Sequence, residues 1–242
     1  MPEFDLLFWI MAGFAAMAGL MRGFAGFGSA MVLSPLLSLY YSPATAVLAI
    51  ALMEVVVSIQ LIPRALPDVQ WRFIGVASAA ALVGMPLGVW ALLVVDAALL
   101  AKFVAAVVLV FVLILASGWR YRGPKRPPVT AGVGAAAGAL LTSTSVGGPP
   151  MLIYMMAGQD DARAVRANII MFFAIAEFVT PFALWLGGAF VAEYLVLGAL
   201  LCPPYLIGAW AGGRLFRTST ERVYRRVALV FLGAIAIYGL LG

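Results

Sequence analysis

The chain has 242 residues, of which 65% are apolar and only 10% are charged. A typical soluble domain is about 45–50% apolar and about 25% charged, and no soluble fold of this length has enough interior to bury so much apolar surface. The composition therefore excludes a soluble globular protein and predicts an all-α polytopic membrane protein, in which a formal net charge of +5 reports loop orientation and does not indicate binding to nucleic acid.

The chain contains no histidine and a single cysteine, Cys202. A disulfide within one chain and a metal site built from histidine and cysteine are therefore excluded. The serine–histidine pair of many hydrolytic enzymes is excluded for the same reason. We expect no enzymatic activity, no metal and no cofactor. The expected partners are a small anionic substrate and the lipid bilayer, and the sequence is compatible with a homodimer.

Apolar segments follow one another along nearly the whole chain. Two of them are broken pairs: 6–41, divided into 6–22 and 24–41, and 129–158, divided into 129–142 and 148–158. The single spans are 43–63, 73–94, 98–118, 165–186, 194–213 and 226–241. With each pair counted once, there are eight hydrophobic segments, which form an N-terminal repeat at 1–122 and a C-terminal repeat at 123–242. Segments 129–142 and 148–158 are each too short to cross a hydrocarbon core of ~30 Å.

Charged loops indicate the orientation of the spans. The loop from Arg120 to Arg126 is the most basic, and the positive-inside rule places it in the cytoplasm together with the loop from Arg214 to Arg226. Loops 95–97 and 187–193 carry an acid and no base, which indicates the periplasm. Both termini are then periplasmic, and 129–158 becomes a re-entrant pair that turns near the middle of the membrane.

The two halves resemble each other. Gly19 and Gly28 match Gly138 and Gly147 at one constant spacing, and further matches follow in the spans. Three crossings separate one pair from the next, so the second half lies inverted relative to the first. We expect two inverted repeats, each a broken helix pair plus three transmembrane helices, which is a recurring plan of secondary transporters. Chance similarity in a chain rich in glycine, alanine and leucine explains the ordered matches less well.

Two glycine-rich breaks, Gly19 to Ser29 and Gly138 to Pro150, interrupt the broken pairs. A half-helix begins after each break, so the free N–H groups and positive dipole ends of both half-helices face the membrane centre and favour an anion. Close helix packing is the alternative role for the glycines. The candidate substrate-binding residues are Arg22, Gly26, Gly28, Ser29, Thr142, Ser143, Thr144, Ser145, Gly147, Gly148 and Pro149.

Three charged residues inside the apolar segments admit two interpretations each. Arg22 faces the substrate if 6–41 is re-entrant, but it is an anchor at the cytoplasmic surface if 6–22 and 24–41 are two full spans. Glu54 and Glu177 are candidates for carrying a coupling proton, because a desolvated carboxylate binds a proton more readily than an exposed one. The alternative is a structural role, in an ion pair with Arg22 or a hydrogen bond between helices.

The stretches Gly19 to Pro35, Gly138 to Pro150 and Arg163 to Asn168 resemble the TauE/SafE sulfite exporter family. The resemblance extends over essentially the whole chain. It implies a bacterial inner-membrane permease for sulfur-containing anions, with the two glycine-rich segments as the substrate path. One departure from symmetry is Leu141, which stands where the repeat would place a second Arg22 and makes the expected site asymmetric.

We therefore expect a secondary transporter that moves sulfite or organosulfonates across the bacterial inner membrane. Its anion site lies near the midplane, at the N-termini of the half-helices, and transport is coupled to protons through Glu54 or Glu177. The alternative is an uncoupled channel or uniporter for other small organic anions.

Overall fold

The computed structural model describes residues 6–117, 123, 125–155 and 162–215. Every element in these ranges is helical. The helices are α1 (Leu6–Ala25), α2 (Ser29–Tyr40), α3 (Pro43–Ala65), the short 3-10 helix η1 (Leu66–Asp68), α4 (Trp71–Val94), α5 (Ala97–Ala116), α6 (Pro127–Thr144), α7 (Gly148–Met155), α8 (Ala162–Leu186) and α9 (Ala192–Leu215). The predicted span 226–241, both termini and most arginines of the two basic loops lie outside the described residues.

The lengths of the helices confirm a polytopic membrane protein. Among the described residues, six helices are long and apolar enough to cross a membrane: α1, α3, α4, α5, α8 and α9. The second members of the broken pairs are short. With 12 residues in α2 and 8 in α7, they extend about 18 Å and about 12 Å, against a hydrocarbon core of about 30 Å. Segment 24–41 is therefore not a second full span.

The first break is shorter and lies later in the chain than the glycine content indicates. The sequence places its start at Gly19 and begins the second apolar segment at residue 24, whereas α1 continues to Ala25 and α2 begins at Ser29. The second break likewise begins after Thr144 and not at Gly138. Glycine alone does not end a helix, and both early glycines have a packing role inside one.

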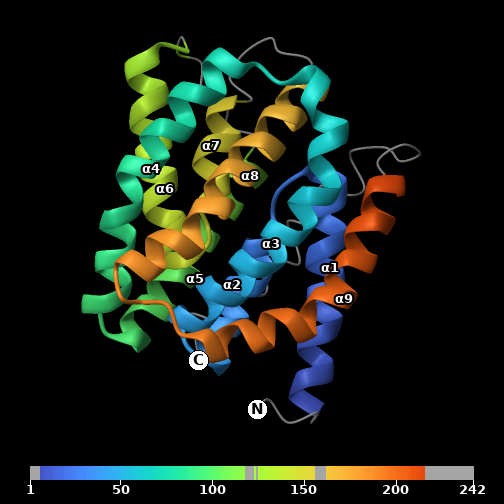
Figure 1. The fold of residues 1–242 in the computed structure, drawn as a ribbon, viewed down its shortest axis with the longest axis vertical. Helices are drawn as coiled ribbons and strands as arrows, with labels where there is room; N and C mark the ends of the chain where they lie inside the picture. Colours follow the sequence, from blue (N-terminus) through green and yellow to red (C-terminus); the bar gives the residue numbers. More distant parts are fainter. Residues whose placement is uncertain (1–5, 118–122, 124, 156–161, 216–242) are drawn as a thin grey trace.

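Figure 1 shows that the two broken pairs enter the bundle from opposite ends. α1 begins at the lower end and α2 returns to it, whereas α6 begins at the upper end and α7 returns there. These directions are the ones that an inverted repeat requires, and the duplication itself stays a prediction. The ends also differ in charge. Arg64 closes α3 and Arg163 opens α8 at the upper end, whereas Asp96 precedes α5 and Glu193 opens α9 at the lower end.

Each broken pair packs its longer helix against a helix of the other half, α1 along α9 and α6 along α4. Small residues spaced four apart permit the close approach, as is common between membrane helices. A Cβ atom at any of these glycines would overlap a backbone carbonyl of the facing helix. The glycines are Gly19 and Gly23 on α1, Gly208 and Gly212 on α9, Gly84 and Gly88 on α4, and Gly134 and Gly138 on α6.

Candidate functional site

Both breaks consist of three residues, 26–28 and 145–147, and they end their helices in the same way. Gly26 follows α1 with φ 82°, and Ser145 follows α6 with φ 61°. These two positions are 119 apart (145 − 26), which is also the spacing of the sequence match between Gly19 and Gly138. A left-handed residue turns the chain away from the helix axis, so the same backbone conformation terminates the longer helix of each pair.

Side chains from other helices satisfy the carbonyls that these terminations leave free. The guanidinium of Arg166, on α8, donates to the carbonyls of Phe24 and Gly23 over 3.2 Å and 2.9 Å. The hydroxyl of Ser34, on α2, donates to the carbonyl of Thr144 at the end of α6. A positive charge beside a helix C-terminus also interacts favourably with the helix dipole. Both longer helices are thereby held at their break.

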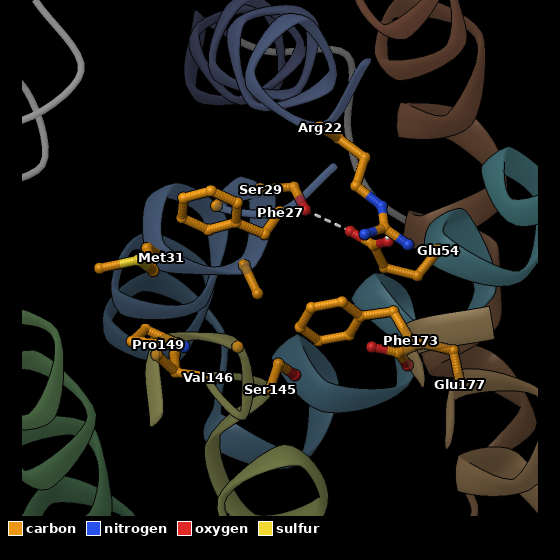
Figure 2. A pocket seen from close by; sticks show the side chains of 13 residues that line it. Arg22, Phe27, Ser29, Met31, Glu54, Ser145, Val146, Pro149, Phe173 and Glu177 are labelled. Atoms are coloured by element: carbon orange, nitrogen blue, oxygen red, sulfur yellow. Dashed lines mark hydrogen bonds and ion pairs between the residues drawn. The ribbon is translucent and has the colours of Figure 1, made fainter. Parts of the chain in front are cut away.

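One cavity lies between the two breaks, and Figure 2 shows the side chains that line it. Gly28 and Ser29 reach it from the start of α2, and Gly148 and Pro149 reach it from the start of α7. Gly28 precedes α2 and makes no side-chain cap, so the first N–H groups of this helix face the cavity without a capping oxygen. Proline has no N–H, and α7 therefore offers fewer donors than α2.

Arg22 lies on the last turns of α1 with only 1% of its surface exposed. Its Nε is 2.7 Å from Oε2 of Glu54. Nη1 donates to the carbonyl of Gly26 in the break, and Nη2 is 3.4 Å from the hydroxyl of Ser58. The centre of the guanidinium also lies 5.0 Å from the centroid of the Phe173 ring. Arg22 is therefore not a surface anchor; it is a buried cation beside the cavity.

Glu54, on α3, is the anion that faces Arg22. Its Oε1 accepts hydrogen bonds from the hydroxyls of Tyr205, over 2.6 Å, and of Ser29. Its Oε2 contacts Nε of Arg22, but the N–H is not directed at this oxygen, so both atoms lack a hydrogen bond although they form an ion pair. The contact between Arg22 and Glu54 is a close ion pair, because opposite charges attract at this distance without an aligned hydrogen bond.

Glu177 brings a second carboxylate to the same cavity from α8. It is buried, and its charge interacts with those of Arg22 and Glu54. Among the described residues, its carboxylate makes no hydrogen bond. In Figure 2 the side chain of Phe173 lies beside Glu177, below the Arg22–Glu54 pair in this view. The cavity thus contains one cation and two acids, of which only one acid contacts the cation directly.

The cavity is closed in this conformation. Its volume open to water is about 10 Å³, which is room for a single water molecule. The side chains of Phe27 and Phe173 occupy much of the space between the breaks, and both line the cavity. An anion with several oxygens needs more room than this, so binding requires the side chains or the half-helices to move.

The structure brings together eight of the residues predicted from the sequence and places five elsewhere. The residues that line the cavity are Arg22, Gly28, Ser29, Glu54, Ser145, Gly148, Pro149 and Glu177. Those that do not are Gly26, Thr142, Ser143, Thr144 and Gly147. Gly26 still contributes, because its carbonyl accepts from Arg22. Gly147 lies close to the carbonyl of Ala137, where a Cβ atom would overlap. Substrate contacts of all of them stay a prediction.

The hydroxyls of Thr142, Ser143 and Thr144 are already bonded. The hydroxyl of Thr142 lies 2.9 Å from the carbonyl of Met85 on α4 and 3.1 Å from that of Gly138. Ser143 and Thr144 donate to the carbonyls of Ala139 and Leu140, over 2.8 Å and 2.6 Å. This pattern is typical of serine and threonine inside a membrane helix, where the hydroxyl returns to the preceding turn. Because α6 extends to Thr144, three of the four consecutive hydroxyls belong to a helix, and only Ser145 reaches the cavity.

Sequence reasoning missed the aromatic part of the site. Tyr205 lies on α9 and binds Glu54, and Phe173 lies on α8 against Arg22. Tyr205 follows Pro203 and Pro204, and a double proline inside an apolar span is a signal that could have directed attention to it. Phe173 carries no such signal, because it is one of many apolar residues in its span.

Comparisons with known proteins give one match. A family model described as Sulfite exporter TauE/SafE matches residues 11–239, which is nearly the whole chain. No curated protein and no solved structure matches the chain. The family match confirms the resemblance inferred from the glycine-rich segments.

Proposed function

This chain belongs to the TauE/SafE sulfite exporter family, and we propose that it is a secondary transporter that moves sulfite or organosulfonates across the bacterial inner membrane. The observation that carries the proposal is the closed cavity, where the uncapped N-terminus of α2 and the buried Arg22 meet. A helix N-terminus and a guanidinium both bind oxyanions. The substrate sits with its oxygens toward Ser29 and Arg22.

The closed state of the cavity supports a carrier over an open channel. Room for about one water molecule leaves no continuous aqueous path through this cavity in this conformation. A carrier instead closes its site between two openings, as transporters with broken helices at the midplane do. The breaks at 26–28 and 145–147 are the proposed hinges, because the helix of each broken pair is interrupted there.

Protons are the proposed coupling ion, and the carboxylates of Glu54 and Glu177 are the groups in the cavity that can carry them.

The upper end of the bundle in Figure 1 faces the cytoplasm, because the arginines at the described helix ends gather there. With the span 226–241 predicted from the sequence, we propose that both termini are periplasmic.

The test is anion binding by purified protein, measured as the shift of the thermal unfolding midpoint with sulfite, sulfoacetate, isethionate, taurine or sulfate. Wild type is expected to be stabilised by sulfite or a sulfonate. Replacing Arg22 alone leaves Glu54 as an unpaired buried charge, so the informative variant is the double substitution Arg22→Gln with Glu54→Gln. It should unfold near the wild-type temperature without anion and show no shift with it.

Arg163→Gln is the matched control, because this arginine is exposed at the start of α8. It should keep the full shift. An unchanged shift in the double variant contradicts the midplane site, and the absence of any shift or flux in wild type contradicts the substrate class. An uncoupled uniporter, the alternative function, predicts flux of the anion that a pH gradient across proteoliposomes does not alter.

A further inference from the structure

Glu54 occupies the place of the proposed substrate. One of its oxygens forms the ion pair with Nε of Arg22 and the other accepts from the hydroxyl of Ser29, and both of these side-chain groups could donate to an anion at the N-terminus of α2. A sulfonate or sulfite group would present its oxygens to these same donors. A carboxylate and a substrate anion cannot both take them, because like charges in a buried cavity repel strongly.

The charges in the cavity determine what must happen to Glu54 when a substrate anion replaces it on Arg22. In the structure, Arg22 and Glu54 together contribute no net charge. If an anion takes the place of Glu54 on Arg22, the displaced carboxylate stays buried without a cation. The titratable groups that face it are Arg22 on α1, Glu177 on α8 and Tyr205 on α9. None of these supplies a second positive charge. Arg166, a further cation that interacts with Arg22, donates to carbonyls of α1 and does not line the cavity. An unpaired buried carboxylate is costly.

We propose that Glu54 is a tethered competitor of the substrate, which leaves Arg22 when the anion binds and then takes up the coupling proton. The inference rests on the proposed function, and it assigns the two carboxylates different roles. The proton comes from water on the side where the anion enters, and it binds a carboxylate oxygen of Glu54. When anion and proton leave on the other side, the ionised Glu54 returns to Arg22.

This exchange keeps the charge of Arg22 balanced in both stable forms, and Glu177 is the same in each. The empty form has the Arg22–Glu54 pair, and the loaded form has the Arg22–anion pair and a neutral Glu54. A form with the anion but no proton, or with the proton but no anion, leaves a buried charge uncompensated, so both forms are disfavoured. Anion and proton therefore move together. Tyr205 and Ser29 donate to the ionised Glu54 in the empty form, and Ser29 is released to the anion in the loaded form.

The experiment uses isethionate with full-length protein in proteoliposomes and in detergent. Wild type should accumulate isethionate when the entry side is more acidic. Glu54→Gln removes the competitor and the proton carrier while keeping the shape of the side chain. It should bind isethionate more tightly, on the order of tenfold, and exchange it across the membrane, yet fail to accumulate it under a pH gradient.

Two further variants show whether the loss of accumulation is specific to Glu54. Glu177→Gln places the same change on the other cavity carboxylate and should keep accumulation dependent on the pH gradient, whatever its rate. Glu193→Gln, at the exposed start of α9, should behave as wild type. Accumulation by Glu54→Gln, or its loss in Glu177→Gln but not in Glu54→Gln, overturns the proposal.

A measurement on wild type alone covers the case in which Glu54→Gln does not fold. Adding isethionate to protein in weak buffer should withdraw about one proton per anion bound, because binding is linked to protonation of the displaced carboxylate. Binding without proton uptake overturns the inference and leaves the transporter standing. A wild type that neither binds nor transports sulfite or a sulfonate overturns both.

Discussion

The hydroxyl of Tyr205 donates a 2.6 Å hydrogen bond to Oε1 of Glu54, across 151 positions of the chain. It links α9 to α3 at the centre of the bundle, and both side chains are buried. The same oxygen accepts from Ser29 at the start of α2. The carboxylate is therefore fixed by three helices: α1 through its arginine, α2 through its serine and α9 through its tyrosine.

Tyr205→Phe removes this hydrogen bond and changes little else. A hydrogen bond to a buried charged group contributes about 1.5–3 kcal/mol, so the thermal unfolding midpoint in detergent should fall. Affinity for the anion should rise at the same time, because a less tightly held Glu54 competes less. Tyr194→Phe is the control, since its phenol lies at the start of α9, away from the cavity, and neither quantity should change. A fall in both stability and affinity contradicts the competition.

Phe173→Leu is expected to change substrate size selectivity. The ring covers Arg22 at 5.0 Å and fills the cavity, so a smaller side chain leaves more room for the group attached to the sulfonate. The ratio of uptake of propanesulfonate to uptake of sulfite should increase. Phe178→Leu, on the exposed face of the same helix with 48% exposure, should leave the ratio unchanged. An unchanged ratio in Phe173→Leu means that the ring does not limit the substrate.

Gly138→Ala and Gly132→Ala should change stability in opposite directions. A Cβ atom at Gly138 would overlap the carbonyl of Ala81, whereas Gly132 has open space around it on the same helix. Overpacking costs about 1–3 kcal/mol, and alanine is favoured over glycine in a helix interior by about 1 kcal/mol. Unfolding in detergent should occur at lower temperature for Gly138→Ala and not for Gly132→Ala. Equal effects contradict the close packing of α4 and α6.

Ser145→Gly should stabilise the fold and weaken anion binding. Ser145 is the one described residue other than glycine with positive φ, and the left-handed conformation costs a residue with a Cβ atom about 1–2 kcal/mol. Glycine removes this cost and also removes a hydroxyl from the cavity. Ser143→Gly, in the last turn of α6, should instead destabilise. Thermal unfolding with and without isethionate separates the two effects, and a loss of stability in Ser145→Gly contradicts the strain.

The sequence by itself determined the class of the protein and the positions of its breaks to within a few residues. Apolar composition and the absence of long polar stretches leave only a membrane protein, because no soluble interior could hold so many apolar side chains. The glycine-rich stretches indicate where each broken pair is interrupted, although the helices continue past Gly19 and Gly138. The buried charges Arg22, Glu54 and Glu177 were visible as single exceptions in apolar runs, since a charge in hydrocarbon is costly and seldom without a function.

Only the tertiary structure decided which of these residues meet. Gly19 and Gly138 are contact points between helices, and their role depends on a facing backbone that no local pattern shows. The hydroxyls of Thr142 to Thr144 are bonded to carbonyls of α6 and α4 because α6 ends later than its glycines indicate. The contacts of Glu54 with Arg22, Ser29 and Tyr205 join three consecutive helices to α9, and Tyr205 is 151 positions away in the chain. Charge and hydrogen bonding act over a few ångströms in space, and only packing sets those distances.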